Sequence, residues 1–362
     1  MNILVLHWGR KGAGPKYNLE MAAALQNQGC NVHAGISKQA ENFHDYSKKG
    51  IKTYSINTYH DIKSAGCFLF RLPLIIKKTI NYIKKNNITH VYCTMPHIFN
   101  VFLSNTFKKN NIKYLLIVHD AKLHSGEENW LIDKLIKNDR KNADGFVVLT
   151  NHVRNQLNSL NKPIHVIPHP VFSYGENNNI PKKMSSNTIK LIFFGRIHHY
   201  KGLDLLLESY KELTKHSFNF SLSIYGSGDL TPYINLIKDI PNLKIENRWI
   251  LDSEIENILL KHDICVIPYR DASQSGVIPT AMNCGIPIIA TPVDGLKEQI
   301  INGKTGIFTT EVSSSSIYQS ILYLSSRPEV YEDISKNSIY FAKNNMSWNN
   351  AALLSINALN DI

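Results

Sequence analysis

The sequence has no uninterrupted apolar run of about 18 residues, the length that a membrane-spanning helix needs. Its opening apolar segment, residues 2–6, lacks the basic stretch of a signal peptide, so we expect a first strand there. Cysteine is scarce and its spacing does not match a metal site; the five residues are Cys30, Cys67, Cys93, Cys265 and Cys284. They lie mostly in apolar segments, which predicts buried, reduced thiols in a cytosolic protein.

Acidic residues are few in the first half of the chain. Residues 1–170 contain 23 Lys and Arg against 10 Asp and Glu, whereas the remainder contains 17 against 19. The whole formal excess of +11 therefore belongs to the first half. Because no nucleic-acid-binding motif accompanies this charge, we interpret the basic half as a surface for an anionic membrane or a phosphorylated lipid.

Apolar, strand-like runs alternate with helix-like segments along most of the chain. The runs are 2–6, 31–36, 89–93, 113–118 and 145–149, then, after a stretch rich in Asn, Ser, Lys and Pro at 173–188, 190–194, 221–225, 243–246, 264–267 and 286–290. A length of 362 residues suits two domains of ordinary size. The pattern predicts an α/β protein with two parallel sheets.

Glycines follow the first expected strand at positions 9, 12 and 14, and Pro15 suits the first turn of a helix. A glycine-rich loop between a strand and a helix can hold a dinucleotide. This spacing is not G-x-G-x-x-G, however, and no acidic residue clearly ends the next strand. A dehydrogenase is therefore disfavoured.

Residues 263–300 form an expected strand, a loop of small residues, a helix and a second strand. The loop leads into the helix at Ser275, Gly276 and Val277, whose free N–H groups would lie at the positive end of the helix dipole. This arrangement predicts an anion site. The alternative is an ordinary strand–helix–strand crossover in which the glycines only turn the chain.

The same segment carries a family resemblance. Residues 281–291, A-M-N-C-G-I-P-I-I-A-T, with Gly295 and Glu298 beyond them, resemble the C-terminal signature of retaining glycosyltransferases of family 4, which have the GT-B fold. The family's other specific signature is F-x-G-R followed by K-G, and residues 193–202 are similar to it. The resemblance covers nearly the whole chain and is strongest between residues 191 and 300.

Two positions depart from the family pattern, which has a glutamate, then G-F-G, then a second glutamate eight residues after the first. Ala272 and Thr280 occupy the acidic positions, with S-Q-S-G-V between them as in a bacterial subgroup. In the family the first glutamate lies by the donor sugar and the second contacts the ribose. Thr280 could still hydrogen-bond a hydroxyl, and Asp271, Ser273 or Gln274 could reach the sugar instead of Ala272.

The F-x-G-R signature ends in Gly195 and Arg196, and the K-G pair begins at Lys201. A nucleotide-sugar leaving group carries a diphosphate that gains charge as the glycosidic bond breaks. Two cations on it would each be worth about 10²–10³ in rate, by analogy with an oxyanion-hole donor. Arginine offers a planar fork and lysine a point charge. The chain has no Asp-x-Asp, the usual metal-binding motif of GT-A enzymes. Its absence is consistent with a site in which fixed cations of the protein take the role of a metal ion.

The resemblance assigns roles to further residues. His119 follows the 113–118 strand and would lie beside the donor sugar and the attacking hydroxyl, although such a histidine taken alone is more often structural. With Arg196 and Lys201 it completes the predicted catalytic set. Other donor contacts are expected at Gly14, Gly195, Gly226, Gly228, Arg248 and Trp249, and acceptor contacts at Gly12, Lys16 and Asp120. Trp249 could stack on the base or pack in the core.

Residues 71–85 are the best amphipathic stretch. Their apolar stripe consists of Leu72, Ile75, Ile76, Ile80 and Ile83, and the lysines lie mostly off it. We expect a helix packed on the sheet. The alternative is a helix on a membrane surface, where each basic residue near an anionic leaflet contributes roughly 1 kcal/mol.

The sequence thus predicts a GT-B protein with Rossmann-like domains at 1–170 and 171–345, facing a cleft, and a final helix in 346–362 that crosses back to the first domain. By resemblance it transfers a hexose-type sugar with retention, with no metal and no cofactor, from a nucleotide diphosphate-sugar used as co-substrate. The expected acceptor is a glycan for bacterial surface polysaccharide or lipopolysaccharide, with an undecaprenyl-diphosphate-linked glycan as the candidate. The expected location is cytoplasmic, peripheral at the inner membrane face. The alternatives are a catalytically impaired nucleotide-binding protein and a GT-B-fold sugar-nucleotide epimerase.

Overall fold

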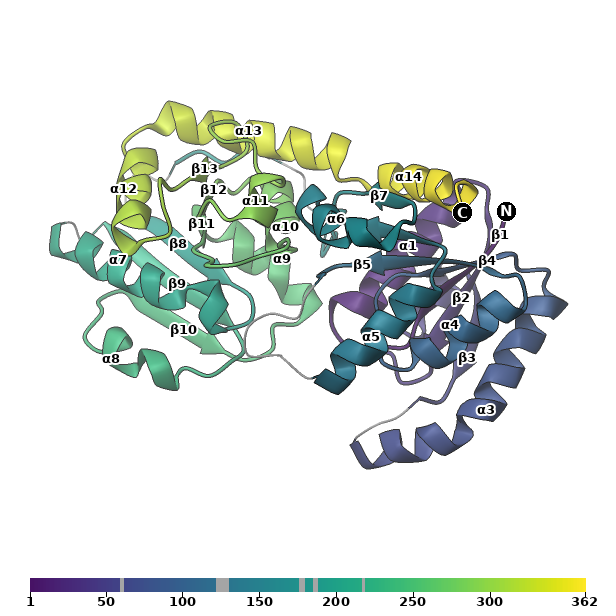
Figure 1. Ribbon diagram of the computed structural model, residues 1–362. Coiled ribbons are helices and arrows are strands. Elements are labelled where there is room, and N and C mark those ends of the chain that lie inside the picture. The colour runs from purple at the N-terminus through teal and green to yellow at the C-terminus, as the bar shows by residue number, and fades with distance from the viewer. Residues whose placement is uncertain (59–61, 122–129, 176–179, 185–187, 217–218) are drawn as a thin grey trace. The chain divides into compact units, whose positions relative to one another are not determined.

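The structure of the protein, a computed structural model, describes residues 1–58, 62–121, 130–175, 180–184, 188–216 and 219–362, and side chains within 62–69 are outside the description (Figure 1). The chain forms two compact units: unit 1 comprises Met1–Pro168 and Trp348–Ile362, and unit 2 comprises His169–Ser347. The sequence predicted boundaries after residues 170 and 345. Part of the predicted linker, at 176–179 and 185–187, lies outside the described residues.

Unit 1 is built on a seven-stranded parallel sheet with the order β3-β2-β1-β4-β5-β6-β7. Its strands are β1 (Asn2–His7), β2 (Asn31–Ser37), β3 (Lys52–Ile56), β4 (His90–Cys93), β5 (Lys113–Val118), β6 (Gly145–Val148) and β7 (Ile164–Val166). Its helices are α1 (Ala13–Asn27), α2 (Asp45–Lys48), α3 (Ile62–Lys85), α4 (Asn100–Lys109), α5 (Trp130–Asn142), α6 (Asn151–Leu157), η1 (Asn158–Leu160) and α14 (Trp348–Asn360).

Unit 2 is built on a six-stranded parallel sheet with the order β10-β9-β8-β11-β12-β13. Its strands are β8 (Ile189–Phe194), β9 (Phe220–Gly226), β10 (Leu243–Asn247), β11 (Ile264–Ile267), β12 (Ile288–Ala290) and β13 (Ile307–Phe308). Its helices are η2 (His199–Lys201), α7 (Leu203–His216), η3 (Thr231–Tyr233), α8 (Ile234–Ile237), α9 (Asp252–Leu260), α10 (Val277–Asn283), α11 (Asp294–Lys297), α12 (Ser314–Ser325) and α13 (Pro328–Asn345).

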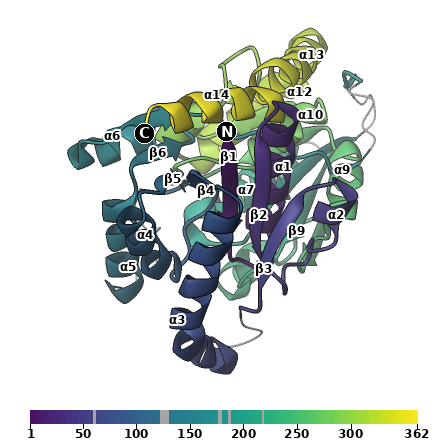
Figure 2. The ribbon, with the colours of Figure 1, turned by 90° about the vertical axis from the view of Figure 1, so that its right-hand side faces the viewer.

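Helices cover both faces of each sheet, so most strands are apolar on both sides. In unit 1, Leu4 and Leu6 share an apolar core with α3 and α4, and on the other face Tyr92 contacts Ser355 of α14 through their hydroxyls at 3.0 Å. As predicted, the last helix packs on unit 1, where it lies along α1 (Figures 1 and 2). The predicted α/β fold with two Rossmann-like parallel sheets is confirmed.

The strand order reverses once in each sheet. In unit 1, β1 pairs with both β2 and β4, and in unit 2, β8 pairs with both β9 and β11. At such a switch point the loops after the two central strands diverge to opposite faces, which leaves a crevice at the carboxyl ends where α/β proteins bind ligands. Ligand-binding residues are therefore expected after β1 and β4 in unit 1, and after β8 and β11 in unit 2.

The amphipathic stretch forms the C-terminal part of α3. Leu72, Ile75, Ile80 and Ile83 are buried in the core of unit 1, so this helix packs on the sheet as expected. None of the helices in the described segments combines the length and the apolar character needed to cross a bilayer. Cysteine thiols are free and buried at Cys30, Cys93, Cys265 and Cys284, whereas the Cys67 side chain lies outside the described part.

Candidate functional site

The ends of β8 and β9 touch at the carboxyl edge of the unit 2 sheet. Gly195 (φ 126°) follows β8, and Gly226 (φ 150°) ends β9. A Cβ atom on Gly226 would lie 1.8 Å from the carbonyl oxygen of Gly195, and one on Gly228 would lie 2.2 Å from that of Ile197. Only glycine permits such backbone contact. The three predicted donor-binding glycines therefore shape this strand edge, while their contact with a donor stays a prediction.

Arg196 and Lys201 lie just beyond the end of β8. Arg196 is exposed directly after Gly195, and Lys201 is half-buried at the end of the turn η2. Gly202 follows with φ 64°, and a Cβ atom on it would lie 1.9 Å from the carbonyl oxygen of Pro268. Because Pro268 directly follows β11, the turn that carries Lys201 is held against the switch point of unit 2.

Tyr269 contacts one of the two cations, Lys201. The Lys201 ammonium donates a hydrogen bond to the Tyr269 hydroxyl at 2.8 Å, and its nitrogen is 3.9 Å from the centroid of that ring. Burial raises the pKa of Tyr269, and the nearby charge of Arg196 opposes that rise. The two residues predicted to bind the diphosphate thus lie in one segment after β8, at the carboxyl edge of the sheet, and Lys201 contacts a buried phenol there.

Arg270 fixes the same turn from outside. Its guanidinium makes two parallel hydrogen bonds to the Asp204 carboxylate, at 2.7 and 2.6 Å, and its backbone N–H donates to the Tyr200 carbonyl at 2.7 Å. Planar, bidentate pairs of this kind are geometrically specific. The loop after β11 therefore holds the loop after β8 through both side-chain and backbone contacts.

The backbone amides at the start of α10 were predicted to bind an anion, and the structure shows that some of them already have partners. The Ser275 N–H donates to Gln299 Oε1 at 2.7 Å, and the Val277 N–H donates to the Ser275 hydroxyl oxygen at 3.3 Å. The prediction that these N–H groups are free for an anion was wrong at Ser275 and Val277, because side chains of the same unit already accept from them. The loop is also held by Gly295, whose N–H donates to the Ala272 carbonyl at 3.1 Å.

The residues predicted to contact the sugar and the ribose have different surroundings in the structure. The Thr280 hydroxyl donates to the Gly276 carbonyl at 3.0 Å, one turn back in its own helix, so its proton is not available to a ribose. Ser273 is buried. The carbonyl oxygen of the Gln274 side chain is buried and has no hydrogen-bond partner in the described part of the chain. A buried acceptor without a donor is costly, which makes Gln274 the member of the loop best suited to receive a ligand hydroxyl.

The loop after β10 meets the glycine turn after β9. Asn247 ties the two together: its Oδ1 accepts from the Gly228 N–H and its Nδ2 donates to the Gly228 carbonyl, both at 3.0 Å. Arg248 donates to the carboxylates of Glu246 and Glu254 at 2.6 to 3.1 Å. Its guanidinium is therefore committed within the protein. The contact expected from this segment is a backbone contact to the base, and it stays a prediction.

Trp249, next in the chain, is 53% exposed. Of its two sequence interpretations, core packing is wrong. Its neighbour Ile250 is buried in the core of unit 2 and anchors the loop. An exposed indole at the carboxyl edge of a strand offers a flat apolar face, and such faces stack on nucleobases.

In unit 1, His119 directly follows β5. Its Nε2 atom lies 3.0 Å from the carbonyl oxygen of Thr94, which follows β4. A carbonyl can only accept, so Nε2 carries the proton and Nδ1 is left as an acceptor in the neutral ring. Burial lowers the pKa of His119 and favours this neutral form. The ring also packs edge-on against Tyr17, with the centroids 5.7 Å apart.

The backbone after His119 is held by α5. Arg140 of that helix donates to the carbonyl oxygens of Asp120 at 2.8 Å and Ala121 at 2.7 Å. The Asp120 side chain is half-buried beside this contact. The predicted role of Asp120 toward an acceptor stays a prediction.

The glycine-rich loop after β1 has its own partner. The Gly12 N–H donates to the Glu41 carboxylate at 2.8 Å, so an acidic residue already occupies the amide that was predicted to lie near phosphates. A carboxylate there also opposes a bound dinucleotide phosphate. Gly14 is buried, and a Cβ atom on it would lie 2.5 Å from His7 Nε2. Lys16 lies, half-buried, in the first turn of α1.

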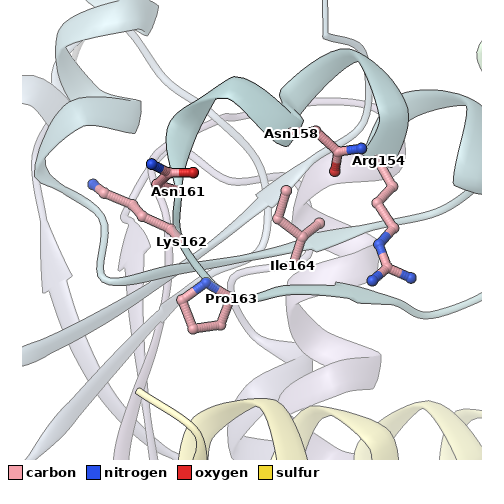
Figure 3. A pocket seen from close by; sticks show the side chains of 6 residues that line it. All are labelled: Arg154, Asn158, Asn161, Lys162, Pro163 and Ile164. Carbon is pink, nitrogen blue, oxygen red and sulfur yellow. The ribbon is translucent and has the colours of Figure 1, made fainter.

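A pocket of ≈440 Å³ opens elsewhere, between α6, η1 and the start of β7 (Figure 3). Its two cations do not converge: Figure 3 shows the Lys162 amine directed away from the Arg154 guanidinium. Lys162 instead donates to carbonyls at the end of α5, including that of Lys141 at 2.7 Å. The pocket lies at the amino end of β7 and not at the ligand-binding edge. In the segments that the structure describes, no cluster of three or more His, Cys, Asp or Glu could hold a metal ion.

Sequence reasoning missed the residues that hold this site together: Tyr269, Arg270, Asn247, Gln299 and Arg140. Tyr269 and Arg270 carried a usable signal, because they follow a buried strand at the edge where α/β proteins bind ligands. Asn247 ends its strand and had the same signal. Gln299 and Arg140 act from helical or turn segments and had none.

Part of the chain matches a family of known proteins. Residues 188–327 match the family model of group 1 glycosyl transferases. The chain is similar to an uncharacterized glycosyltransferase of Methanocaldococcus jannaschii, with 29% identity over 68% of this chain and 67% of the relative. It is also similar to the N-acetyl-alpha-D-glucosaminyl L-malate synthase of Bacillus anthracis, with 20% identity over 80% and 81% of the two chains.

Among solved structures, HepE of Anabaena, determined with UDP and with UDP-glucose, matches with a TM-score of 0.77 at 15% identity over 100% of both chains. The UDP-GlcNAc 2-epimerase of Neisseria meningitidis matches with a lower TM-score of 0.65 at 14% identity, again over 100% of both chains. At these identities the structural matches show the fold alone, which is GT-B. The family match and the sequence relatives support a group 1 glycosyltransferase.

Proposed function

We propose that the protein is a retaining, metal-independent glycosyltransferase that moves a hexose-type sugar from a nucleotide diphosphate-sugar to a glycan hydroxyl. The observation that carries this proposal is the position of Arg196 and Lys201, both in the segment that follows β8, at the switch point of the unit 2 sheet. As the bond between the sugar and the diphosphate breaks, the leaving oxygen gains negative charge. Two fixed cations stabilise that charge without a metal ion.

In the proposed reaction the acceptor hydroxyl attacks the anomeric carbon from the side on which the diphosphate leaves. The bond from that carbon to the diphosphate oxygen breaks, the bond to the acceptor oxygen forms, and the acceptor proton passes to the leaving diphosphate. No enzyme nucleophile is required. Retention follows because departure and attack share one face of the sugar.

Further donor contacts are proposed from the loops of unit 2. The buried carbonyl oxygen of Gln274 would accept a hydrogen bond from a sugar hydroxyl, which compensates for the alanine at position 272. The exposed Trp249 indole would stack on the base. Gly195, Gly226 and Gly228 would let the nucleotide approach the backbone closely. On unit 1, Nε2 of His119 carries the proton, so Nδ1 would accept a hydrogen bond from a hydroxyl of the donor sugar or of the acceptor glycan.

The first test is nucleotide binding by wild type and Arg196→Ala, measured as thermal stabilisation by UDP, GDP, dTDP and CMP in EDTA. A nucleotide at 100 times its Kd should add about 2.7 kcal/mol to the free energy of unfolding. We expect one diphosphate to stabilise wild type and the effect to be strongly reduced in Arg196→Ala. Arg154→Ala, which removes an arginine of unit 1, is the matched control and should respond as wild type does. Stabilisation by none of the four would refute the proposed donor site.

The chemical outcome has its own test. With the matching nucleotide-sugar, NMR of the transferred sugar should show the anomeric configuration of the donor, in the presence of EDTA. Inversion, or strict dependence on added Mg²⁺ or Mn²⁺, would contradict the proposed mechanism. Interconversion of the nucleotide-sugar with its epimer and no transfer would favour the epimerase.

We further propose that the acceptor is lipid-linked, as in bacterial surface polysaccharide synthesis, and is met at an anionic membrane surface on the cytoplasmic side. The support is the exposed face of α3, where Phe70 is 90% and Leu74 is 60% exposed, one turn apart. Lys77 and Lys78, one turn further on, are exposed as well. The apolar stripe that the membrane alternative would place in the bilayer is buried in the protein, so Phe70 and Leu74 would insert in its place.

Co-sedimentation with vesicles tests this surface. Wild type should bind vesicles that contain phosphatidylglycerol, bind pure phosphatidylcholine weakly, and dissociate as salt rises, because charge attraction is screened. The double variant Phe70→Ser, Leu74→Ser should bind less. Ile234→Ser, which removes an exposed apolar side chain from unit 2, is the control. Binding that is independent of anionic lipid and of salt would contradict the membrane proposal.

A further inference from the structure

Tyr269 has no part in the reaction proposed above, yet its hydroxyl lies 2.8 Å from the ammonium nitrogen of one of the two cations. We propose that Tyr269 is a positioning residue, which holds the Lys201 ammonium group ready for the donor diphosphate before the donor binds. This inference rests on the proposed function of unit 2 and adds to it the element that orders its lysine.

The position of Tyr269 follows from the chain around it. β11 ends at Ile267, Pro268 stops the strand, and Tyr269 turns back into the protein, where its side chain is only 1% exposed. Its ring lies edge-on to that of Tyr200, with the centroids 6.5 Å apart. A phenol that is packed this tightly cannot change rotamer without moving the loop, so its hydroxyl is a fixed point.

Lys201 receives two contacts from this fixed point. Its ammonium donates to the Tyr269 hydroxyl at 2.8 Å, and the nitrogen is 3.9 Å from the ring centroid, within the range of a cation–π interaction. The nitrogen is also 5.4 Å from the Tyr200 ring centroid. A lysine side chain is flexible and loses much rotamer freedom when it binds a ligand. Contacts that order it in advance reduce that loss, which is the general advantage of a preorganised site.

The backbone of the same segment supports this role. Pro268 limits position 202 to glycine, and Arg270 holds the Tyr200 carbonyl through its N–H. Three consecutive residues after β11 therefore contact the turn that carries Lys201. Of these three contacts, that of Tyr269 is to the lysine side chain itself, whereas the other two fix the backbone on either side of it.

The hydroxyl of Tyr269 also faces the loop before α10. Its oxygen lies 3.4 Å from the Ser275 hydroxyl oxygen. An ammonium group can only donate, so the Tyr269 oxygen accepts from Lys201, and in its contact with Ser275 either hydroxyl can be the donor. Ser275 is fixed in turn by Gln299. Lys201 is thus linked through Tyr269 to the S-Q-S-G-V loop, and the phenol joins two loops of the proposed donor site.

The test is Tyr269→Phe, which removes the hydroxyl and keeps the ring. Binding is measured by calorimetry for UDP, GDP and dTDP, each paired with uridine, guanosine or thymidine. For the diphosphate that wild type binds, we expect Tyr269→Phe to weaken affinity by about five- to tenfold, the effect of one ordinary hydrogen bond. Affinity for the matching nucleoside, which has no phosphate, should not change. Tyr210→Phe removes a buried hydroxyl that bonds backbone carbonyls elsewhere in unit 2, and should leave both affinities as in wild type.

A second measurement separates positioning from a general structural role. In a Lys201→Ala background, Tyr269→Phe should have no further effect on diphosphate affinity, because the group it positions is gone. A full effect in that background, or equal loss of nucleoside affinity, would overturn the inference and make Tyr269 a structural residue. Wild-type affinity in Tyr269→Phe would overturn it too. Failure of wild type to bind any of the diphosphates is a different result, which removes the proposed function itself.

Discussion

Ser275 and Gln299 exchange two hydrogen bonds. The Ser275 N–H donates to Gln299 Oε1 at 2.7 Å, and Gln299 Nε2 donates to the Ser275 carbonyl at 3.1 Å. Both residues are buried. The side-chain amide thus pairs with the backbone as a neighbouring strand would, and it fixes a loop that has no regular structure of its own. The shape of the S-Q-S-G-V loop is therefore built into unit 2 before any ligand arrives.

Replacing Gln299 by alanine should destabilise unit 2. Two buried backbone groups of Ser275 would lose their partners, and each such loss costs about 1–3 kcal/mol. We expect the free energy of unfolding in urea to fall by about 2–4 kcal/mol in Gln299→Ala. Gln299→Glu keeps an acceptor for the N–H but loses the donor, so its stability should lie between those of wild type and Gln299→Ala. Equal stability of all three proteins would contradict this role.

Gly226 should tolerate no side chain. A Cβ atom there would lie 1.8 Å from the Gly195 carbonyl oxygen, and the residue has φ 150°. Gly226→Ala should lose more than about 4 kcal/mol of stability, or fail to fold, because backbone atoms must move apart. Gly303 is the matched control: its φ is 74°, but no heavy atom lies within 4 Å of the position that a Cβ atom would take, so Gly303→Ala should cost only about 1–2 kcal/mol. Similar unfolding midpoints for the two variants would show that the contact at Gly226 is not limiting.

The interior of each sheet was predictable because its strands are buried on both faces. The run 264–267 coincides with β11, and 2–6 with most of β1. β3, β7 and β13 were not predicted. Each lies at the edge of its sheet and is only partly buried, so its sequence carries no continuous apolar run. The alternation of polar and apolar residues in K-T-Y-S-I is too short to identify β3.

The site was predictable where chemistry depends on a local pattern and not where it depends on a distant partner. Gly195, Arg196 and Lys201 lie within one loop and fit a spacing. The occupied Ser275 amide could not be foreseen, because its acceptor is 24 residues away in sequence. The occupied Gly12 amide could not be foreseen either, because its acceptor, Glu41, is 29 residues away in sequence. Hydrogen-bond partners brought in by the fold decide which amides stay available to a ligand.

Acid should destabilise unit 1 through two histidines whose pKa values are lowered in the folded chain. Burial lowers the pKa of His97 from 6.5 to about 4 and that of His7 from 6.5 to about 3. Between those values and 6.5 the unfolded chain binds more protons than the folded one, so the free energy of unfolding falls as pH drops below 6.5. Each histidine contributes a slope of up to about 1.4 kcal/mol per pH unit.

The histidine effect is best measured between pH 6.5 and 5, above the range where most carboxylates titrate. His97→Gln should show a shallower loss of stability across this window than wild type, because one imidazole of lowered pKa no longer takes up a proton on unfolding. His44→Gln, which removes an exposed histidine, should follow the wild-type curve. If His97→Gln and wild type lose stability in parallel, His97 is not the group that titrates.

Trp249 should contribute to nucleotide binding and not to stability. Its indole is 53% exposed, so Trp249→Ala should change the free energy of unfolding by less than about 0.5 kcal/mol. Stacking of a base on an aromatic ring is worth about 1–3 kcal/mol, so affinity for the bound nucleoside diphosphate should fall about 5- to 150-fold. Leu251→Ala is the control, because Leu251 is 57% exposed two residues further on and has no aromatic face. If calorimetry gives the same affinity for Trp249→Ala as for Leu251→Ala, the base does not stack on this side chain, and the nucleotide is held through its diphosphate and sugar alone.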